Sequence, residues 1–334
     1  MNTKTAMITI AGRPNVGKST LTNYLVGEKI AIVSNKPQTT RNRICGIVTR
    51  GDTQFVFVDT PGYHRARTKL GDYMVNVARE SIADVDATIL VVEPIASIGP
   101  QEEGLIEKIT GKGIDQYLKE TFWDPMGLTH ITYNPLDNGF TKDQTAATEL
   151  NGNSRDGVIS FANIREGVIQ GTVHDEKAYY AMGGISGHAG LYANATTLAK
   201  LAQVMQNYNG YGQTRLANYE TNRFFAGRKD ALAQWGMGWW RQGNYQRPWY
   251  FGQQAPSTTI GHQGWTGTLS SIDTENNLTT VYLTNKINSP VTDNKSNANK
   301  FDGNWYTASS LGFVPTIIYM GMNEFNAAED IQPA

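Results

Sequence analysis

The strongest chemical signal in this 334-residue sequence is a glycine-rich run, Gly12–Thr20, that contains Gly17, Lys18 and Ser19. The run fits G-x-x-x-x-G-K-[ST], the pattern of a loop whose backbone N–H groups surround a phosphate. Lys18 is then expected to reach the β- and γ-phosphates, and Ser19 to place its hydroxyl on Mg²⁺. The alternative is a glycine-rich turn without a ligand, and the flanking segments argue against that alternative.

Those flanking segments predict the elements that a phosphate-binding loop requires. The apolar run Met7–Ala11 predicts a strand that leads into the loop, and Ser19–Val26 predicts a helix that leaves it. A helix that begins at the loop points free N–H groups and the positive end of its dipole at the phosphate. The sequence therefore predicts strand, loop and helix in the order that phosphate binding needs.

A second predicted strand supplies the rest of this site. Phe55–Val58 leads into Asp59-Thr60-Pro61-Gly62, where an acid can hold Mg²⁺ through water and the Gly62 N–H can reach a γ-phosphate. The polar segment Gln38–Arg41 offers one of two threonines to complete the Mg²⁺ shell. The predicted Mg²⁺ residues are Ser19, Thr40 and Asp59. The predicted nucleotide-binding residues are Gly12, Asn15, Val16, Gly17, Lys18, Ser19, Thr20, Thr39, Thr40, Asp59, Thr60, Pro61 and Gly62.

Over about its first 105 residues, the sequence resembles the Era family of small GTPases. The resemblance is carried by Gly12–Leu21, Lys36–Arg41, Asp59–Gly62, Lys69–Met74 and Ala87–Glu93. It implies GTP as ligand, Mg²⁺ as cofactor, GTP hydrolysis, and a role in ribosome assembly in which a C-terminal KH domain binds ribosomal RNA. Tyr63 follows the Asp-Thr-Pro-Gly motif, so the resemblance implies that something other than a glutamine side chain positions the attacking water.

The sequence departs from this family where the guanine base should be read. The family requires Asn-Lys-x-Asp on a further strand, and the stretch Ile109–Asp137 does not contain it. The later Asn285-Lys286-Ile287-Asn288 has asparagine in place of the aspartate, and we interpret it as chance. A Gly-x-x-Gly loop on a basic helix, the mark of a KH domain, is also missing near the C-terminus. We therefore predict phosphate and Mg²⁺ binding with little selection of the base.

From about residue 106 the sequence resembles a second family, the penicillin-binding-protein-like serine hydrolases related to class C β-lactamases. The penicillin-binding-protein 4B type is the most similar. The resemblance is carried by Ile109–Leu128, Ala146–Ile159, His174–Met205 and Ile260–Thr268. It implies hydrolysis of peptidoglycan peptides or β-lactams, and a peptidoglycan-type ligand.

The residues that would perform this hydrolysis are mostly missing. In the resembled family, Ser-x-x-Lys supplies the nucleophile and its base, and Tyr-x-Asn supplies a second proton carrier. A Lys/His-x-Gly strand lines the site. Only the third is recognised, as His262-Gln263-Gly264, because no lysine has a serine three positions earlier. Tyr192-Ala193-Asn194 fits the second by letters, but we interpret Asn194 as a helix cap. The catalytic residues therefore remain unknown.

We predict two domains joined within Glu103–Thr110. Residues 1–108 are expected to form a truncated Era-type GTP-binding domain, an α/β P-loop fragment with a mostly parallel sheet. Its strands should lie near Met7–Ala11, Cys45–Thr49, Gln54–Val58 and Ala87–Glu93, the last as an exposed edge. Residues 109–334 are expected to form a truncated α+β fragment of the β-lactamase type, with His262 on an antiparallel sheet. Because the apolar spacing is continuous at the join, one helix is expected to run through it.

Composition limits the remaining choices. The net charge of −1 gives no electrostatic case for nucleic acid, and Cys45 is the only cysteine, so no disulfide framework is predicted. No apolar run is long enough to cross a membrane and no signal peptide is recognised, which predicts a cytoplasmic protein. His174 and His188 lack metal-ligand spacing. Trp235, Trp239, Trp240, Tyr245 and Trp249 either pack in a core, which we favour, or line a sugar groove. Three functions remain open: a nucleotide-binding protein with weak GTPase activity, a serine hydrolase that lacks its nucleophile, and a non-catalytic fusion.

Overall fold

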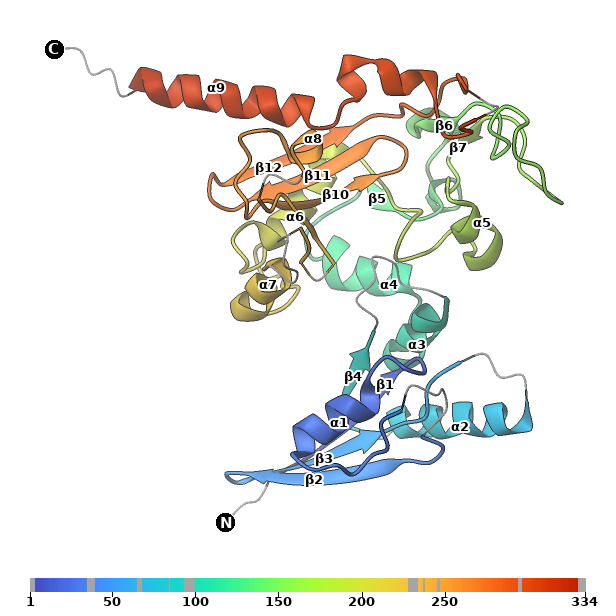
Figure 1. Ribbon diagram of the computed structural model, residues 1–334, viewed down its shortest axis with the longest axis vertical. Coiled ribbons are helices and arrows are strands. Elements are labelled where there is room, and N and C mark those ends of the chain that lie inside the picture. Colours follow the sequence, from blue (N-terminus) through green and yellow to red (C-terminus); the bar gives the residue numbers. More distant parts are fainter. Residues whose placement is uncertain are drawn as a thin grey trace. The chain divides into compact units, whose positions relative to one another are not determined.

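The computed structural model describes residues 4–34, 40–64, 68–83, 85–92, 100–227, 234–236, 238–244, 247–293 and 296–329. The chain divides into two compact units, Met1–Tyr117 and Leu118–Ala334, each with its own sheet and core (Figure 1). We call them the N-terminal unit and the C-terminal unit.

The N-terminal unit is built on a four-stranded sheet in the order β2-β3-β1-β4. The strands are β1 (Lys4–Gly12), β2 (Ile44–Arg50), β3 (Thr53–Asp59) and β4 (Ala87–Val91). β1 pairs in parallel with β3 and β4, and β2 pairs with β3 in antiparallel fashion. The predicted mostly parallel α/β sheet is therefore confirmed, and each of the four strands overlaps its expected range.

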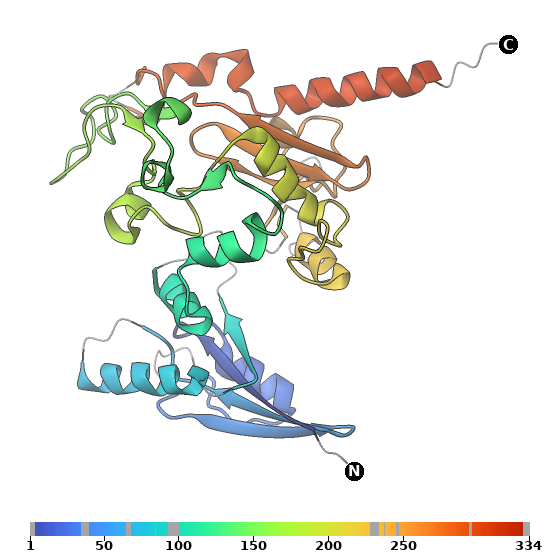
Figure 2. The same ribbon diagram turned by 180° about the vertical axis from the view of Figure 1, so that it is seen from behind.

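Helices cover both faces of this sheet. α1 (Lys18–Val26) and α2 (Lys69–Ala83) lie on opposite faces, as the two views in Figures 1 and 2 show, and α3 (Pro100–Thr110) packs against α2. The buried apolar side chains come from the strand interiors and the inner helix faces. Among them are Ile10, Ala11, Phe57, Val58, Met74, Ala78 and Leu105.

β4 ends the described part of this sheet. It pairs with β1 through Ala87–Val91, and its other edge has no partner among the described strands. The sequence predicts this edge position, although Glu93, the expected last residue of the strand, lies outside the described residues. A mostly apolar strand with an unpaired edge is a site of self-association.

The segment that joins the two family patterns differs from the expectation of one continuous helix. α3 ends at Thr110, and Gly111 has a left-handed conformation with φ 71°. A second helix, α4 (Ile114–Leu118), then begins and continues as a π-helical turn, η1 (Lys119–Trp123). Glycine adopts the left-handed conformation at little cost and commonly ends helices. The apolar spacing therefore continues across the join although the helix does not.

The C-terminal unit is built on an antiparallel sheet in the order β12-β11-β10-β9. The strands are β9 (Trp240–Arg241), β10 (Ile260–Gly264), β11 (Thr268–Asp273) and β12 (Leu278–Leu283). Their pairing is antiparallel throughout, and His262 of β10 pairs with Ser270 of β11. The prediction that His262 lies on an antiparallel sheet is confirmed.

Helices cover both faces of this sheet. Successive side chains of a strand point to opposite faces, so residues of β11 contribute to two separate clusters. Leu269 of β11 joins a core cluster with Phe251 of α8 (Pro248–Phe251) and Tyr319 of α9 (Phe313–Glu329). Ile272, three residues further along β11, joins a cluster with Met205 of α6 (Ala195–Gln206) and Ala226 of α7 (Tyr219–Ala226). Figure 2 shows α6 crossing the sheet. These two helical layers fix β10, and with it His262.

The rest of this unit is rich in loops. Its short elements are β5 (Ile131–Thr132), β6 (Ala147–Glu149), β7 (Ile169–Gln170), α5 (Glu176–Met182), β8 (Tyr192–Ala193), and the 3₁₀ turns η2 (Pro135–Asn138), η3 (Lys142–Gln144), η4 (Asp302–Trp305) and η5 (Thr307–Ser309). β5 pairs with β8, and β6 pairs with β7. In the described parts of both units, no helix combines the length and the apolar character needed to cross a bilayer.

Candidate functional site

The glycine-rich run forms a loop between the end of β1 and the start of α1. Asn15 and Gly17 have left-handed backbones, with φ 65° and 93°, which turn the chain back over the helix N-terminus. Gly12 lies so close to β4 that an added Cβ would be 2.3 Å from the carbonyl oxygen of Val91. A residue larger than glycine at position 12 would therefore push the loop away from the sheet.

Lys18 lies inside this loop and not on its surface. Its exposed fraction is 6%, and its Nζ donates a hydrogen bond of 2.7 Å to the carbonyl oxygen of Arg13. Burial lowers the pKa of Lys18 to about 8, against the opposing effect of the Asp59 charge. The fold thus holds the Lys18 ammonium group at the N-terminus of α1, in surroundings that favour an anion beside it.

Ser19, Thr40 and Asp59 come together from three segments of the chain. Ser19 Oγ donates to Asp59 Oδ2 at 2.6 Å and lies 3.1 Å from Thr40 Oγ1, which is 3.3 Å from the same carboxylate oxygen. Asp59 is fully buried, and burial raises its pKa while hydrogen bonds and the Lys18 charge lower it. Its Oδ1 is buried with no hydrogen-bond partner among the described residues.

This trio fits a magnesium ion by its chemistry. Two hydroxyl oxygens and one carboxylate are hard ligands, and Mg²⁺ is commonly held by one or two carboxylates together with waters and substrate phosphates. The buried Oδ1 of Asp59 is the kind of acceptor that such an ion or its water would satisfy.

A cavity of about 250 Å³ lies against the loop. Ile32 and Val33, which we did not predict as site residues, also line it, and they are 67% and 50% exposed. The sequence reasoning missed these two exposed apolar side chains beside the phosphate loop. Among the described residues, the lining is Pro14, Asn15, Gly17, Lys18, Ser19, Thr20, Ile32, Val33, Ser34, Thr40 and Gly62.

Hydrogen bonds join the Asp-Thr-Pro-Gly segment and the residue after it to β1 and the phosphate loop. Thr60 Oγ1 donates to the carbonyl oxygen of Ile10 at 2.8 Å, and the Tyr63 N–H donates to the carbonyl oxygen of Gly12 at 3.0 Å. Gly62 lies against Pro14, where an added Cβ would be 2.6 Å from the proline nitrogen. Any larger residue at position 62 would separate the two loops that line the cavity.

The remaining predicted site residues have different positions. Thr20 lines the cavity, whereas Val16 packs beneath the loop, where its Cγ2 lies 2.9 Å from the place of a Cβ on Gly12. Pro61 is buried within the second loop. Thr39 lies outside the described residues.

In the C-terminal unit, His262 is exposed on β10 and its ring lies 4.7 Å from the ring of Trp240, centroid to centroid. Its Nδ1 is 2.6 Å from the carbonyl oxygen of Gln263. Gly264 lies against β11, where an added Cβ would be 2.2 Å from Thr268 Oγ1. The third hydrolase motif is thus an ordered strand with one imidazole facing outward.

The residues that fit the second hydrolase motif or the guanine-binding motif by letters have structural roles. The hydroxyl of Tyr192 donates to the carbonyl oxygen of Thr172 at 2.7 Å, and burial raises the pKa of Tyr192 to about 12. Asn194 caps α6 by accepting from the Thr197 N–H at 2.8 Å, which confirms its predicted role. The Asn285 amide donates to the carbonyl oxygen of Ala147. A tyrosine with so high a pKa is a poor proton carrier near neutral pH.

One array that the sequence reasoning missed links a serine, a histidine and an aspartate. His188 Nδ1 lies 2.5 Å from Ser186 Oγ, and His188 Nε2 lies 3.2 Å from Asp175 Oδ1. The order is that of a hydrolase triad, but Ser186 is 1% exposed, so a substrate carbonyl cannot reach its hydroxyl. Asp175 also caps α5. The array therefore fixes the Gly183–Gly190 loop against α5. Among the described residues, His, Cys, Asp and Glu form no group of three or more that could hold a metal ion.

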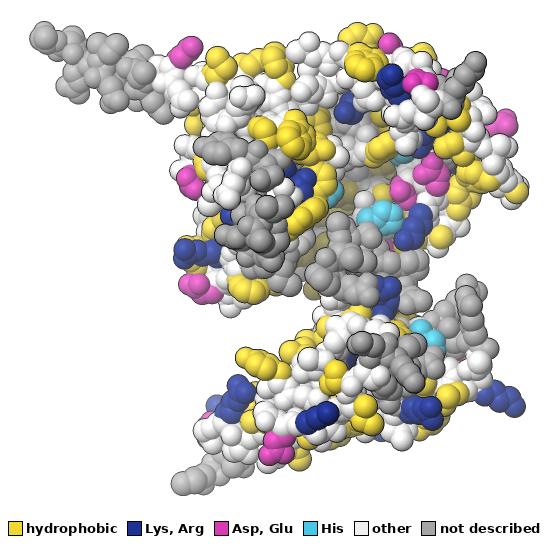
Figure 3. Space-filling view, in the orientation of Figure 1, with side chains coloured by type: hydrophobic (Ala, Val, Ile, Leu, Met, Phe, Trp, Pro, Cys, Tyr) yellow, Lys and Arg dark blue, Asp and Glu magenta, His cyan; other side chains and the backbone are white. Residues whose placement is uncertain are grey.

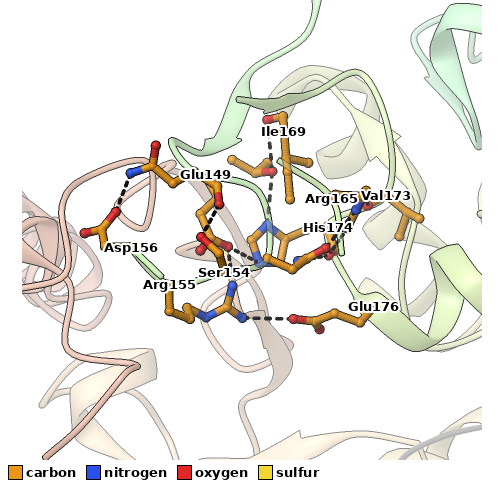
Figure 4. Close-up of polar contacts among 12 residues, drawn as sticks. Glu149, Ser154, Arg155, Asp156, Arg165, Ile169, Val173, His174 and Glu176 are labelled. Carbon is orange, nitrogen blue, oxygen red and sulfur yellow. Dashed lines mark hydrogen bonds and ion pairs between the residues drawn. The ribbon is translucent and has the colours of Figure 1, made fainter. Parts of the chain in front are cut away.

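A second buried polar network holds the loops around β6 together (Figure 4). The side chains of Glu149 and Arg155 are 3% and 6% exposed and form an ion pair. Arg155 also reaches Glu176 at 3.2 Å, and His174 Nε2 lies 3.2 Å from the Glu149 carboxylate. Burial and the two nearby arginines lower the pKa of His174 to about 4, so this imidazole is neutral near pH 7. Burial raises the pKa of Glu149, against the effect of Arg155.

The tryptophans divide between the two alternatives considered from the sequence. Trp239 and Trp240 pack against core clusters, which confirms core packing for these two. Trp235 and Trp249 are 40% and 59% exposed, so core packing is wrong for them, and Tyr245 lies outside the described residues. The C-terminal unit also shows several yellow apolar groups on the face drawn in Figure 3.

Two known families match different parts of the chain. Residues 7–120 match the model of a family described as 50S ribosome-binding GTPase, and residues 103–304 match the beta-lactamase family model. The two matches overlap over residues 103–120, which include most of α3 and all of α4.

Individual relatives match parts of the chain. A protein of Escherichia coli K12 named "Putative D-alanyl-D-alanine carboxypeptidase" is 46% identical over 220 residues, covering 66% of this chain and 51% of its own length. A Bacillus subtilis protein named N-acetylmuramyl-L-alanine amidase is 45% identical, covering 65% and 49%. The chain thus spans about half the length of the curated relatives it matches. A structure of Era with MgGDPNP and part of 16S ribosomal RNA is 34% identical, covering 33% of this chain and 38% of that one, with a TM-score of 0.32.

Proposed function

This chain belongs to the beta-lactamase family through residues 103–304 and carries a GTPase domain over residues 7–120, and we propose that its function resides in the GTPase domain. The proposed activity is Mg²⁺-dependent binding of a nucleoside triphosphate, followed by slow hydrolysis. GTP is the family's nucleotide. The observation that carries the proposal is that Lys18, Ser19 and Thr40 line one cavity, with the buried Asp59 hydrogen-bonded to Ser19 and Thr40.

The residues divide this task in a simple way. The N–H groups of the loop and Lys18 would bind the phosphates, and Ser19, Thr40 and Asp59 would hold Mg²⁺. Gly62 would meet the γ-phosphate, because it lines the cavity on the side of the second loop. Bound Mg²⁺ would neutralise charge on the phosphate oxygens. These roles need no base-specific contact.

The proposal includes weak selection of the base. Orders of magnitude in selectivity come from buried polar groups that only the right substrate satisfies. The one Asn-Lys-x-Asp in the sequence, Asn299–Asp302, lies within the residues that match the beta-lactamase family and not after a strand of the GTPase domain, so we do not assign it to guanine. Era was crystallised with a segment of 16S ribosomal RNA, but binding of ribosomal RNA is not part of the proposal for this chain.

Equilibrium titration of the full chain with fluorescently labelled GTP and ATP tests the proposal. Saturable binding of both nucleotides in Mg²⁺, with dissociation constants within about tenfold of each other, supports it. Tenfold corresponds to about 1.4 kcal/mol, which is less than a dedicated base-reading pocket supplies.

A second, narrower proposal concerns the C-terminal unit: it binds peptidoglycan-type ligands without forming an acyl-enzyme. Its support is the ordered His262 strand together with the names of the curated relatives. Acylation requires a serine activated by a neighbouring base. The sequence has no Ser-x-x-Lys, and Ser186 is buried.

Accordingly, a fluorescent penicillin is expected to leave the chain unlabelled. The measurement is gel fluorescence after incubation with excess probe, with an active penicillin-binding protein as the positive control. Stoichiometric labelling that disappears when one serine is replaced by alanine would contradict the proposal and identify the nucleophile. Replacing Ser186 is the first such variant, because its hydroxyl lies 2.5 Å from His188.

A further inference from the structure

Lys108 on α3 lies over the ring of Tyr63, with its Nζ 5.6 Å from the ring centroid. A cation at this distance is attracted by the negative face of an aromatic ring. Tyr63 is the residue that follows Gly62, which lines the cavity. A charged side chain from α3 is therefore coupled to the loop that would meet the γ-phosphate.

Three contacts make this coupling stiff. The Tyr63 N–H donates to the carbonyl oxygen of Gly12 at 3.0 Å, so the loop is tied to the phosphate loop at that point. The close approach of Gly62 to Pro14 leaves no room for the backbone to shift inward. On the other side, α3 is anchored by Leu105, which is 1% exposed and lies one turn before Lys108.

We propose that Lys108 is a positioning residue for the γ-phosphate. It holds the Tyr63 ring and thereby sets the Gly62 N–H. The inference rests on the proposed nucleotide binding and names what that site would prefer, a triphosphate over a diphosphate. A diphosphate has no group at this position, so its affinity should not depend on Lys108.

The test compares the affinities of the full chain for labelled GTPγS and labelled GDP in Mg²⁺. Lys108→Met should lower the preference for GTPγS over GDP by about two- to fivefold, the range that a partly exposed cation–π contact supports. Affinity for GDP should change by less than about twofold. Lys108→Arg should restore the preference, because arginine also stacks on aromatic rings.

Two further variants separate this mechanism from a general effect. Tyr63→Leu should cause the same loss, and the Tyr63→Leu, Lys108→Met double variant should lose no more than either single variant. Lys69→Met removes an equal charge from an exposed position on α2 of the same unit, and should leave the preference unchanged.

The outcomes distinguish this inference from the proposed function. If the unaltered chain binds GDP and GTPγS but Lys108→Met leaves their ratio unchanged, the inference is wrong and the proposed function stands. If Lys69→Met lowers the ratio equally, the effect is one of net charge and the inference is again wrong. If the unaltered chain binds neither nucleotide, both fail.

Discussion

Lys18→Ala is expected to weaken nucleoside triphosphate binding about thirtyfold or more. Lys18 is buried at the N-terminus of α1, where it lines the cavity and is shielded from water. Removing one partner of a buried, hydrogen-bonded charge pair costs about 2–5 kcal/mol, and each 1.4 kcal/mol is a factor of about ten in affinity. Titration with labelled GTP in Mg²⁺ measures the change.

Lys69→Ala is the matched control for this variant. It removes the same charge from the exposed start of α2 and should alter the dissociation constant by less than about threefold, because exposed charges are screened by solvent and salt. A Lys18→Ala chain that binds triphosphate as tightly as the control would show that the loop does not bind phosphate through this residue.

The largest expected effect on stability comes from Glu149→Gln in the C-terminal unit. Among the described residues, this change leaves the buried Arg155 guanidinium with Glu176 as its remaining ion-pair partner. Breaking a buried ion pair by removing one partner costs about 3–5 kcal/mol, a large part of the roughly 5–15 kcal/mol that stabilises a typical domain. Denaturant unfolding followed by tryptophan fluorescence measures it, since all seven tryptophans belong to this unit.

Glu176→Gln supplies the comparison. It removes a charge from the same arginine, but from a side chain that is 37% exposed, so the expected loss is about 1 kcal/mol or less. Equal losses for the two variants would mean that the burial of Glu149 does not determine its contribution. Nucleotide binding by the N-terminal unit should be unaffected by either change.

The phosphate site could be predicted from the sequence because its determinants are local. Gly12–Thr20 specifies its own turn, and the adjacent apolar runs specify the strand and helix that place it. The meeting of Ser19 and Asp59 could also be anticipated, because the parallel strands β1 and β3 bring their carboxyl ends to one edge of the sheet. Thr40 reaches the same edge because it precedes β2, which is antiparallel to β3 and begins beside Asp59. Ile32 and Val33 could not, since nothing in their spacing shows that the fold leaves them exposed.

The features that sequence reasoning missed depend on contacts between distant segments. The pairing of Arg155 with Glu149, and the place of His188 between Ser186 and Asp175, arise in loops without hydrophobic periodicity. The break at Gly111 was missed for a different reason. The apolar spacing on both sides fits one helix, and only the backbone conformation of a single glycine ends it.

The central claim is that the intact phosphate site binds Mg²⁺-nucleotide without a guanine reader. Titration of the full chain with labelled GTP and with labelled ATP, each in Mg²⁺ and again in excess EDTA, tests it most directly. We predict saturable binding of both nucleotides in Mg²⁺ with affinities within about tenfold, and much weaker binding of both in EDTA. No saturable binding, equal binding in EDTA, or a preference for GTP of about a hundredfold or more would contradict the claim.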